Sequence, residues 1–156
     1  MVTTAALAVG TQAIYHNCPL SMDEYSALFQ STIFSEGRLT GQFPPALVEW
    51  LTPPWLRGRF IRMSTETGAT LSSYWPGFSL LLTPFTALGV PWLLNPLIGG
   101  ATILVMHRVA LVLFDDTESA GFAVLMTLAS PAVTINALSY YSMPAHLLAN
   151  AMYLLL

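Results

Sequence analysis

The chain has 156 residues, of which 54% are hydrophobic and only 8% are charged. Soluble domains carry about 25% charged residues, so this composition excludes an ordinary soluble domain and predicts a multi-pass membrane protein. A formal net charge of −3 and a single cysteine exclude a basic nucleic-acid-binding surface and an internal disulfide framework. The first predicted span is short and covers residues 2–16, ending in side chains suited to a membrane interface.

An amphipathic helix is predicted at about residues 22–36, directly after the first span. Ser21 and Glu24 have the spacing of a capping box, in which the serine side chain binds a free helix N–H and the glutamate reaches back. Asp23 in the first turn suits the helix dipole. One apolar stripe recurs at helical spacing and consists of Tyr25, Leu28, Phe29 and Ile33. A helix of this length is too short to span a bilayer, so we expect it to lie on the membrane surface.

The next region, residues 38–74, holds most of the polarity of the chain and is predicted to be a long loop. It is followed by an apolar run from Phe78 to Gly89 that contains Pro84. A run this short predicts an interfacial or re-entrant helix at about residues 77–90, with a kinked span as the alternative.

Three further spans are predicted, at residues 95–114, 120–138 and 145–156. Asp115 and Asp116 lie in the polar turn between the first two of these spans. The last span stops before it reaches full length, so we expect the sequence to be the N-terminal part of a single, longer polytopic domain. The predicted fold is therefore all-α and multi-pass, with a long first loop that carries amphipathic helices.

The order of these features is similar to that of a known superfamily. An acidic pair, Asp23-Glu24, follows the first span; Tyr74-Trp75-Pro76-Gly77-Phe78 opens the short apolar segment; and Asn95-Pro96-Leu97 opens the next span. This pattern resembles the GT-C membrane glycosyltransferases that use polyprenyl-phosphate sugars, which include the protein O-mannosyltransferases and the aminoarabinose transferases. The resemblance covers the whole chain but only the N-terminal part of such an enzyme, and the acidic pair is its most specific element.

The resemblance implies an integral membrane protein with a cytoplasmic N-terminus and an extracytoplasmic first loop that carries the catalytic carboxylate. It implies a polyprenyl-phosphate-linked sugar and membrane lipid as partners. Several relatives carry a second carboxylate in the second outer loop, where this chain has residues 139–146 and no acid. His146 is the candidate substitute there. No metal ligands are assigned, and a divalent metal stays open as a cofactor.

Transfer of a sugar to an acceptor hydroxyl needs a base that takes the hydroxyl proton, and a carboxylate can serve. Asp23 is the candidate base, with Glu24 orienting Asp23 or the acceptor. The simpler interpretation is that both acids only stabilise the start of the helix.

The leaving lipid phosphate needs nearby positive charge. The candidate cations are Arg57, Arg59, Arg62 and Arg38. A solvated loop, or attraction to anionic headgroups, is the simpler interpretation of these arginines. Tyr74 and Trp75 are candidates for stacking on the sugar, although aromatic side chains are also common at membrane interfaces.

The predicted function is therefore inverting transfer of a sugar from a polyprenyl-phosphate donor on the extracytoplasmic side, with Asp23 as general base. The alternative is a non-catalytic multi-pass membrane protein, such as a transporter part or an assembly factor, in which Asp23 and Glu24 cap a helix. We expect the 156-residue chain alone to be inactive, because most of the donor groove would lie outside it.

Overall fold

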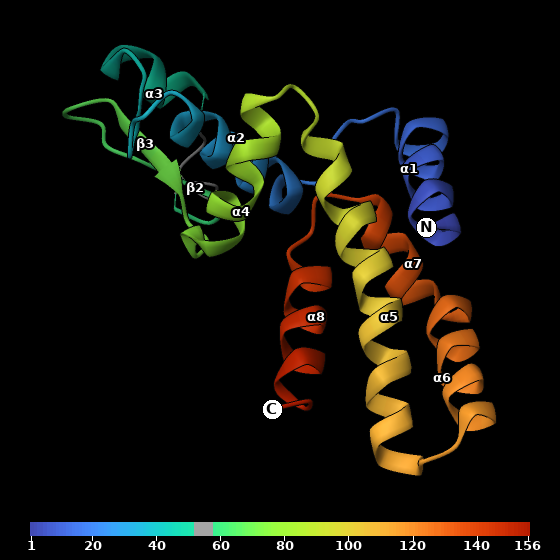
Figure 1. Ribbon diagram of the computed structural model, residues 1–156. Coiled ribbons are helices and arrows are strands. Elements are labelled where there is room, and N and C mark those ends of the chain that lie inside the picture. Colours follow the sequence, from blue (N-terminus) through green and yellow to red (C-terminus); the bar gives the residue numbers. More distant parts are fainter. Residues whose placement is uncertain (52–57) are drawn as a thin grey trace. The chain divides into compact units, whose positions relative to one another are not determined.

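The computed structural model describes residues 1–51 and 58–156, which are mostly helical with one small β-sheet (Figure 1). The chain forms two compact units. We call Pro19–Pro91 the mixed unit, and Met1–Cys18 together with Trp92–Leu156 the helical unit. The predicted predominance of helices is confirmed, but the prediction of a purely α fold is wrong because the region predicted as a loop contains strands.

Helix α2 (Met22–Ser35) of the mixed unit begins at the predicted capping box. The Ser21 Oγ accepts the Glu24 backbone N–H at 3.3 Å, and the Glu24 Oε2 accepts the Ser21 N–H at 3.0 Å. The helix ends just before Gly37, whose φ of 74° lies in the left-handed region that favours glycine. The capping-box prediction is confirmed.

The buried face of α2 differs from its apolar stripe. The buried side chains are Glu24, Ser26, Ala27, Gln30, Ser31 and Ile33. Tyr25 is exposed, whereas Leu28 and Phe29 are half-buried. Small side chains let helix α4 (Pro76–Ala87) approach closely, and Ser31 Oγ lies 2.9 Å from Thr86 Oγ1 of α4. Helix α2 thus packs mainly through small and polar groups, and of its apolar stripe only Ile33 is fully buried.

Three short strands and helix α3 lie where the sequence predicted only a loop. They are β1 (Gly41–Gln42), α3 (Pro45–Leu51), β2 (Ile61–Met63) and β3 (Ala69–Ser72). The strands form an antiparallel sheet in the order β1-β3-β2, with Gly41 opposite Thr70. Gly68 ends the β2–β3 turn with a φ of 72°, and a Cβ there would lie 1.8 Å from the Phe43 carbonyl oxygen. This position therefore requires glycine.

Helix α4 begins at Pro76, whose missing N–H costs nothing in a first turn. Its 12 residues span about 18 Å, which is less than the roughly 30 Å of a bilayer core. The predicted short helix is confirmed, with Pro84 inside it.

In the helical unit, the long helix α5 (Leu94–Phe114) is the central element. The helices that pack against it are α1 (Val2–Tyr15), α6 (Thr117–Ala129), α7 (Pro131–Leu138) and α8 (Met143–Tyr153). Gly100 lets α1 come close, because a Cβ at that position would lie 2.0 Å from the Thr4 Oγ1. A Cβ at Gly99 would lie 2.8 Å from the Leu7 Cδ1 of α1 and 3.0 Å from the Ala137 Cβ of α7.

Within the described residues, one helical segment is long and apolar enough to cross a membrane. It covers Pro91–Phe114, with 24 residues and a mean hydropathy of 2.0, and it includes the predicted span 95–114. Helices α1 and α8 have 14 and 11 residues, which is fewer than the roughly 20 that a straight span needs.

The predicted span 120–138 is not one straight helix. Helices α6 and α7 meet at a bend of 59°, and only the two together are long and apolar enough to cross a membrane. Pro131 lacks the N–H that would continue the α6 hydrogen-bond ladder, and it holds Ser130 extended, with ψ at 114°. The bend therefore follows from this proline.

The turn between α5 and α6 uses two aspartates differently. Asp115 has a φ of 50° and ends α5, a conformation that Asp tolerates better than most residues. Asp116 caps α6 by accepting the backbone N–H groups of Glu118 at 3.3 Å and Ser119 at 2.7 Å. Hydrogen bonds from the Ser119 side chain and from these two N–H groups lower the pKa of Asp116 below its ordinary value of 3.8.

Candidate functional site

Two predicted site residues, Asp23 and Tyr74, meet in the mixed unit. Asp23 lies in the first turn of α2, and Tyr74 lies just before the start of α4. The Tyr74 hydroxyl donates a hydrogen bond to Asp23 Oδ1 across 51 residues of sequence. The Asp23 side chain is exposed, and Tyr74 is 46% exposed. The structure therefore joins a carboxylate and a phenol at the surface, where two packed helices begin.

A buried chain of hydrogen bonds from α2 fixes the backbone next to Tyr74. The Tyr74 N–H donates to Ser72 Oγ at 3.1 Å, and the Ser72 N–H donates to Gln30 Oε1 at 2.8 Å. The Gln30 Nε2 donates to the Leu39 carbonyl at 3.1 Å. Helix α2 thus carries both Asp23 and the amide that positions the segment leading to Tyr74. Sequence reasoning missed Gln30 and Ser72, although an uncharged amide within an amphipathic helix was a usable signal.

The segment that contains Arg59 lies beside α2. Ser26 Oγ donates to the Phe60 carbonyl at 2.7 Å, and the Ser73 N–H donates to the same oxygen at 2.9 Å. The Arg59 guanidinium carbon lies 5.6 Å from the centroid of the Phe60 ring, within the range of a cation–π contact. These contacts bring Arg59 into the same part of the unit as the start of α2.

The other predicted arginines have separate surroundings. Arg62 is exposed on β2, and Arg38 pairs with Glu36. In residues 1–51 and 58–156, no ion pair joins any arginine to Asp23. Arg57 lies outside the described residues.

Glu24 has surroundings unlike those of its neighbour Asp23. It is 1% exposed, and its Oε2 accepts the backbone N–H groups of Leu20 and Ser21, both at 3.0 Å. The Ser21 hydroxyl donates to the same oxygen at 3.2 Å. Glu24 therefore caps the N-terminus of α2, whereas the exposed Asp23 side chain accepts a hydrogen bond from Tyr74.

Two further predicted site residues do not join this pair. Trp75 is 92% exposed at the N-cap of α4. His146 is exposed in the first turn of α8 and belongs to the helical unit. Across the described part of the chain, no three His, Cys, Asp or Glu side chains are grouped as metal ligands.

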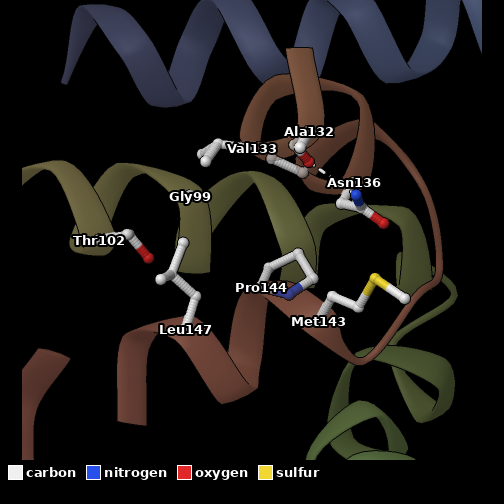
Figure 2. A pocket seen from close by; sticks show the side chains of 9 residues that line it. Gly99, Thr102, Ala132, Val133, Asn136, Met143, Pro144 and Leu147 are labelled. Carbon is white, nitrogen blue, oxygen red and sulfur yellow. Dashed lines mark hydrogen bonds between the residues drawn. The ribbon is translucent and has the colours of Figure 1, made fainter. Parts of the chain in front are cut away.

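The helical unit contains an apolar cavity of about 200 Å³ between α5, α7 and α8. Figure 2 shows Thr102 from α5, Asn136 from α7, and Met143 and Leu147 from α8 around it. The polar groups bond within their own helices: Thr102 Oγ1 donates to the Ile98 carbonyl at 2.8 Å, and Asn136 Nδ2 to the Ala132 carbonyl at 2.6 Å. The cavity therefore suits a hydrocarbon group.

Comparison of the chain with protein-family models, with curated proteins and with solved structures gave no match. The resemblance to the GT-C transferases stays a prediction. The chemistry of the Asp23–Tyr74 pair and its surroundings is accordingly the basis for the function proposed below.

Proposed function

We propose that this chain belongs to a multi-pass membrane glycosyltransferase that moves a sugar from a polyprenyl-phosphate donor to an acceptor hydroxyl on the extracytoplasmic side. The hydrogen bond between Tyr74 and Asp23 carries the proposal. It unites, at one exposed point, a carboxylate suited to general-base catalysis and an aromatic side chain suited to a sugar.

In the proposed reaction, Asp23 is the general base. The acceptor oxygen attacks the anomeric carbon, and its proton passes to the Asp23 carboxylate. The bond from the anomeric carbon to the phosphate oxygen breaks, and the electron pair leaves on the lipid phosphate. Attack opposite the leaving group inverts the anomeric configuration. The Tyr74 hydroxyl holds Oδ1, so Oδ2 is the oxygen that receives the proton.

The developing phosphate charge would be stabilised by arginines of the mixed unit. Arg59 is the strongest candidate, because the bond from Ser26 to the Phe60 carbonyl holds its segment beside α2. Arg57 and Arg62 are further proposed contacts for the donor. The exposed ring of Trp75 is available for stacking on the sugar.

Membrane insertion of the helical unit is part of the proposal. Pro91–Phe114 supplies one candidate span, and the bent pair α6–α7 supplies a second, broken one. Helices α5 and α6 leave large apolar side chains exposed, including Leu104, Val112, Phe122 and Met126, which suits contact with lipid. The apolar cavity between α5, α7 and α8 would take a lipid chain.

A transfer assay of the full-length protein in native membranes tests the proposal. Labelled sugar is supplied on polyprenyl phosphate, and transfer is compared for wild type, Asp23→Asn and Tyr74→Phe. We expect Asp23→Asn to lose about 10²–10⁴-fold in rate, as general bases contribute. Tyr74→Phe should lose roughly tenfold, because it removes one hydrogen bond to the carboxylate. Glu66→Gln, an exposed carboxylate in the β2–β3 turn, is the matched control and should keep full activity.

The buried position of Glu24 favours a second candidate, in which the protein is a non-catalytic multi-pass membrane protein and the acids only stabilise α2. Three hydrogen bonds to Glu24 Oε2 give that residue a sufficient structural role. This candidate predicts no donor-dependent transfer by the wild-type protein with polyprenyl-phosphate mannose, glucose or aminoarabinose. Full transfer by Asp23→Asn would instead refute the assignment of the base.

A further inference from the structure

We propose that the mixed unit binds a neutral saccharide in a groove between α2 and β1, separate from the Asp23–Tyr74 pair. The groove has a volume of about 330 Å³, which is within the roughly 300–1,000 Å³ of small-molecule sites. Helix α2 contributes Tyr25, Leu28 and Phe29 to its lining, and the β1 segment contributes Gln42 and Phe43.

The aromatic wall of the groove is formed by Tyr25 and Phe29 of α2, of which Tyr25 is exposed and Phe29 is half-buried. The Tyr25 and Phe29 rings are stacked, with centroids 6.2 Å apart and an interplanar angle of 21°. Both rings line the groove, and the Tyr25 ring is the more accessible of the two because Tyr25 is 45% exposed. The C–H faces of a sugar ring can pack on an accessible aromatic ring while the hydroxyl groups remain at the edges.

The two charged side chains that line the groove, Glu36 and Arg38, have opposite charges. Arg38 and Glu36 form an ion pair, and each side chain is 50% exposed. An anionic ligand would meet the Glu36 carboxylate, and a cationic ligand would meet the Arg38 guanidinium. A sugar hydroxyl both accepts and donates hydrogen bonds, so a neutral saccharide can satisfy both groups. The ion pair therefore favours a neutral polyhydroxylated ligand over a phosphate.

The neighbouring sheet edge argues against an extended peptide as the ligand. Strand β1 lies at the edge of the sheet but has only two residues, Gly41 and Gln42. Peptides that add a strand gain affinity from a row of main-chain hydrogen bonds. A two-residue edge offers almost none of that row, so recognition here depends on the rings and on the ion pair.

A binding experiment tests this inference without relying on sugar transfer. The protein is placed in lipid nanodiscs free of sugar-headgroup detergents, since a maltoside would compete. Saturation-transfer NMR and calorimetry are carried out with maltose, cellobiose, lactose and mannobiose, and with glucose 6-phosphate and glucosamine as charged probes. We expect at least one neutral disaccharide to bind through its ring C–H protons, more tightly than either charged probe.

Variants test whether the saccharide binds in this groove. Tyr25→Ala and the double variant Glu36→Gln/Arg38→Gln should each weaken binding at least tenfold, whereas Tyr25→Phe keeps the ring and should bind as wild type. Tyr153→Ala removes an exposed tyrosine of the helical unit and should change nothing. Circular dichroism of each variant checks the fold, which these exposed positions should preserve.

Three outcomes would overturn the inference: no neutral disaccharide binds, glucose 6-phosphate binds more tightly than every neutral disaccharide, or Tyr25→Ala binds unchanged. Loss of the transfer activity proposed above would not affect it, because saccharide binding is measured without a donor.

Discussion

Ser72 donates its backbone N–H to Gln30 Oε1 at 2.8 Å, inside the contact between β3 and α2. The same amide group donates through Nε2 to the Leu39 carbonyl at 3.1 Å. Gln30 therefore satisfies two backbone groups from two different segments, with 4% of its own surface exposed. One side chain of α2 fixes both the approach to β1 and the residues that lead to Tyr74.

Gln30→Leu should destabilise the mixed unit by about 1–3 kcal/mol, because it leaves a buried N–H and a partly buried carbonyl without partners. The measurement is urea unfolding followed by tryptophan fluorescence. Gln42→Leu is the control, since Gln42 is exposed and its bond to the Thr67 carbonyl lies at the surface. Equal losses for the two variants would show that the buried amide has no special role.

The sequence predicted the elements whose signals are local. The capping box of α2 is encoded by Ser21 and Glu24, three residues apart. The bend between α6 and α7 was not predicted, although Pro131 lies at its break. The strands escaped prediction because β1 and β2 have two and three residues. Alternation of apolar and polar residues cannot be detected over so few positions. The glycine at position 68, which ends the β2–β3 turn, was the only indication of strands in this part of the sequence that we recognise.

The candidate site could be predicted only in part. Asp23 and Tyr74 were each singled out, but their contact depends on hydrogen bonds between segments far apart in sequence, such as Gln30 to Ser72. The separate surroundings of Asp23 and Glu24 follow from the capping geometry, which is local. The exposure of Tyr25 could not be predicted from the helical periodicity. That pattern identifies the apolar face of a helix but does not show which residues of that face other elements cover.

Asn95 ties the start of α5 to the connection between α7 and α8. Its Nδ2 donates to the Ser139 carbonyl at 2.7 Å and to the Tyr141 carbonyl at 2.9 Å, and the residue is 3% exposed. Asn95→Leu should destabilise the helical unit by about 1–3 kcal/mol, because both carbonyls lose their donor. Thermal unfolding in nanodiscs measures the effect. Asn150→Leu on the exposed side of α8 should leave the unfolding temperature nearly unchanged.

Replacing Gly100 and Gly121 of the helical unit by alanine should change its stability in opposite directions. A Cβ at Gly100 would lie 2.0 Å from Thr4 Oγ1, whereas a Cβ at Gly121 meets nothing within 4 Å. Gly100→Ala should destabilise the unit by about 1–3 kcal/mol through overpacking between α1 and α5. Gly121→Ala should stabilise α6 by up to about 1 kcal/mol through helix propensity.

The double variant Gly100→Ala/Thr4→Ala tests the cause of the first effect. Removing the Thr4 hydroxyl should restore part of the lost stability, because the closest atom is gone and the Thr4 Cβ lies 3.2 Å away. The unfolding temperatures of the single and double variants give the comparison. Additive losses would place the strain at another contact.

Asp116 should make the unfolding temperature of the helical unit depend on pH in the acidic range. Its pKa in the folded chain lies below the ordinary value of 3.8, because Ser119 and Glu118 donate hydrogen bonds to the charged carboxylate. A depressed folded pKa stabilises the fold above the unfolded pKa, and that contribution is lost as the pH falls through the folded pKa. The contribution of Asp116 to the unfolding temperature should therefore decrease as the pH falls below 3.8 and through the lower folded pKa.

Two neighbouring variants separate this effect from general acid unfolding. Asp116→Asn keeps a good N-cap but carries no titrating group, so its unfolding temperature should fall less than that of wild type over the same acidic range. Asp115→Asn removes an adjacent carboxylate at a position where Asn also tolerates the left-handed backbone, and it should follow the wild-type profile. If Asp116→Asn showed the full wild-type decrease, another carboxylate would be responsible. Because Asp116 is the N-cap of α6, the loss should appear first as fraying of α6 in hydrogen exchange.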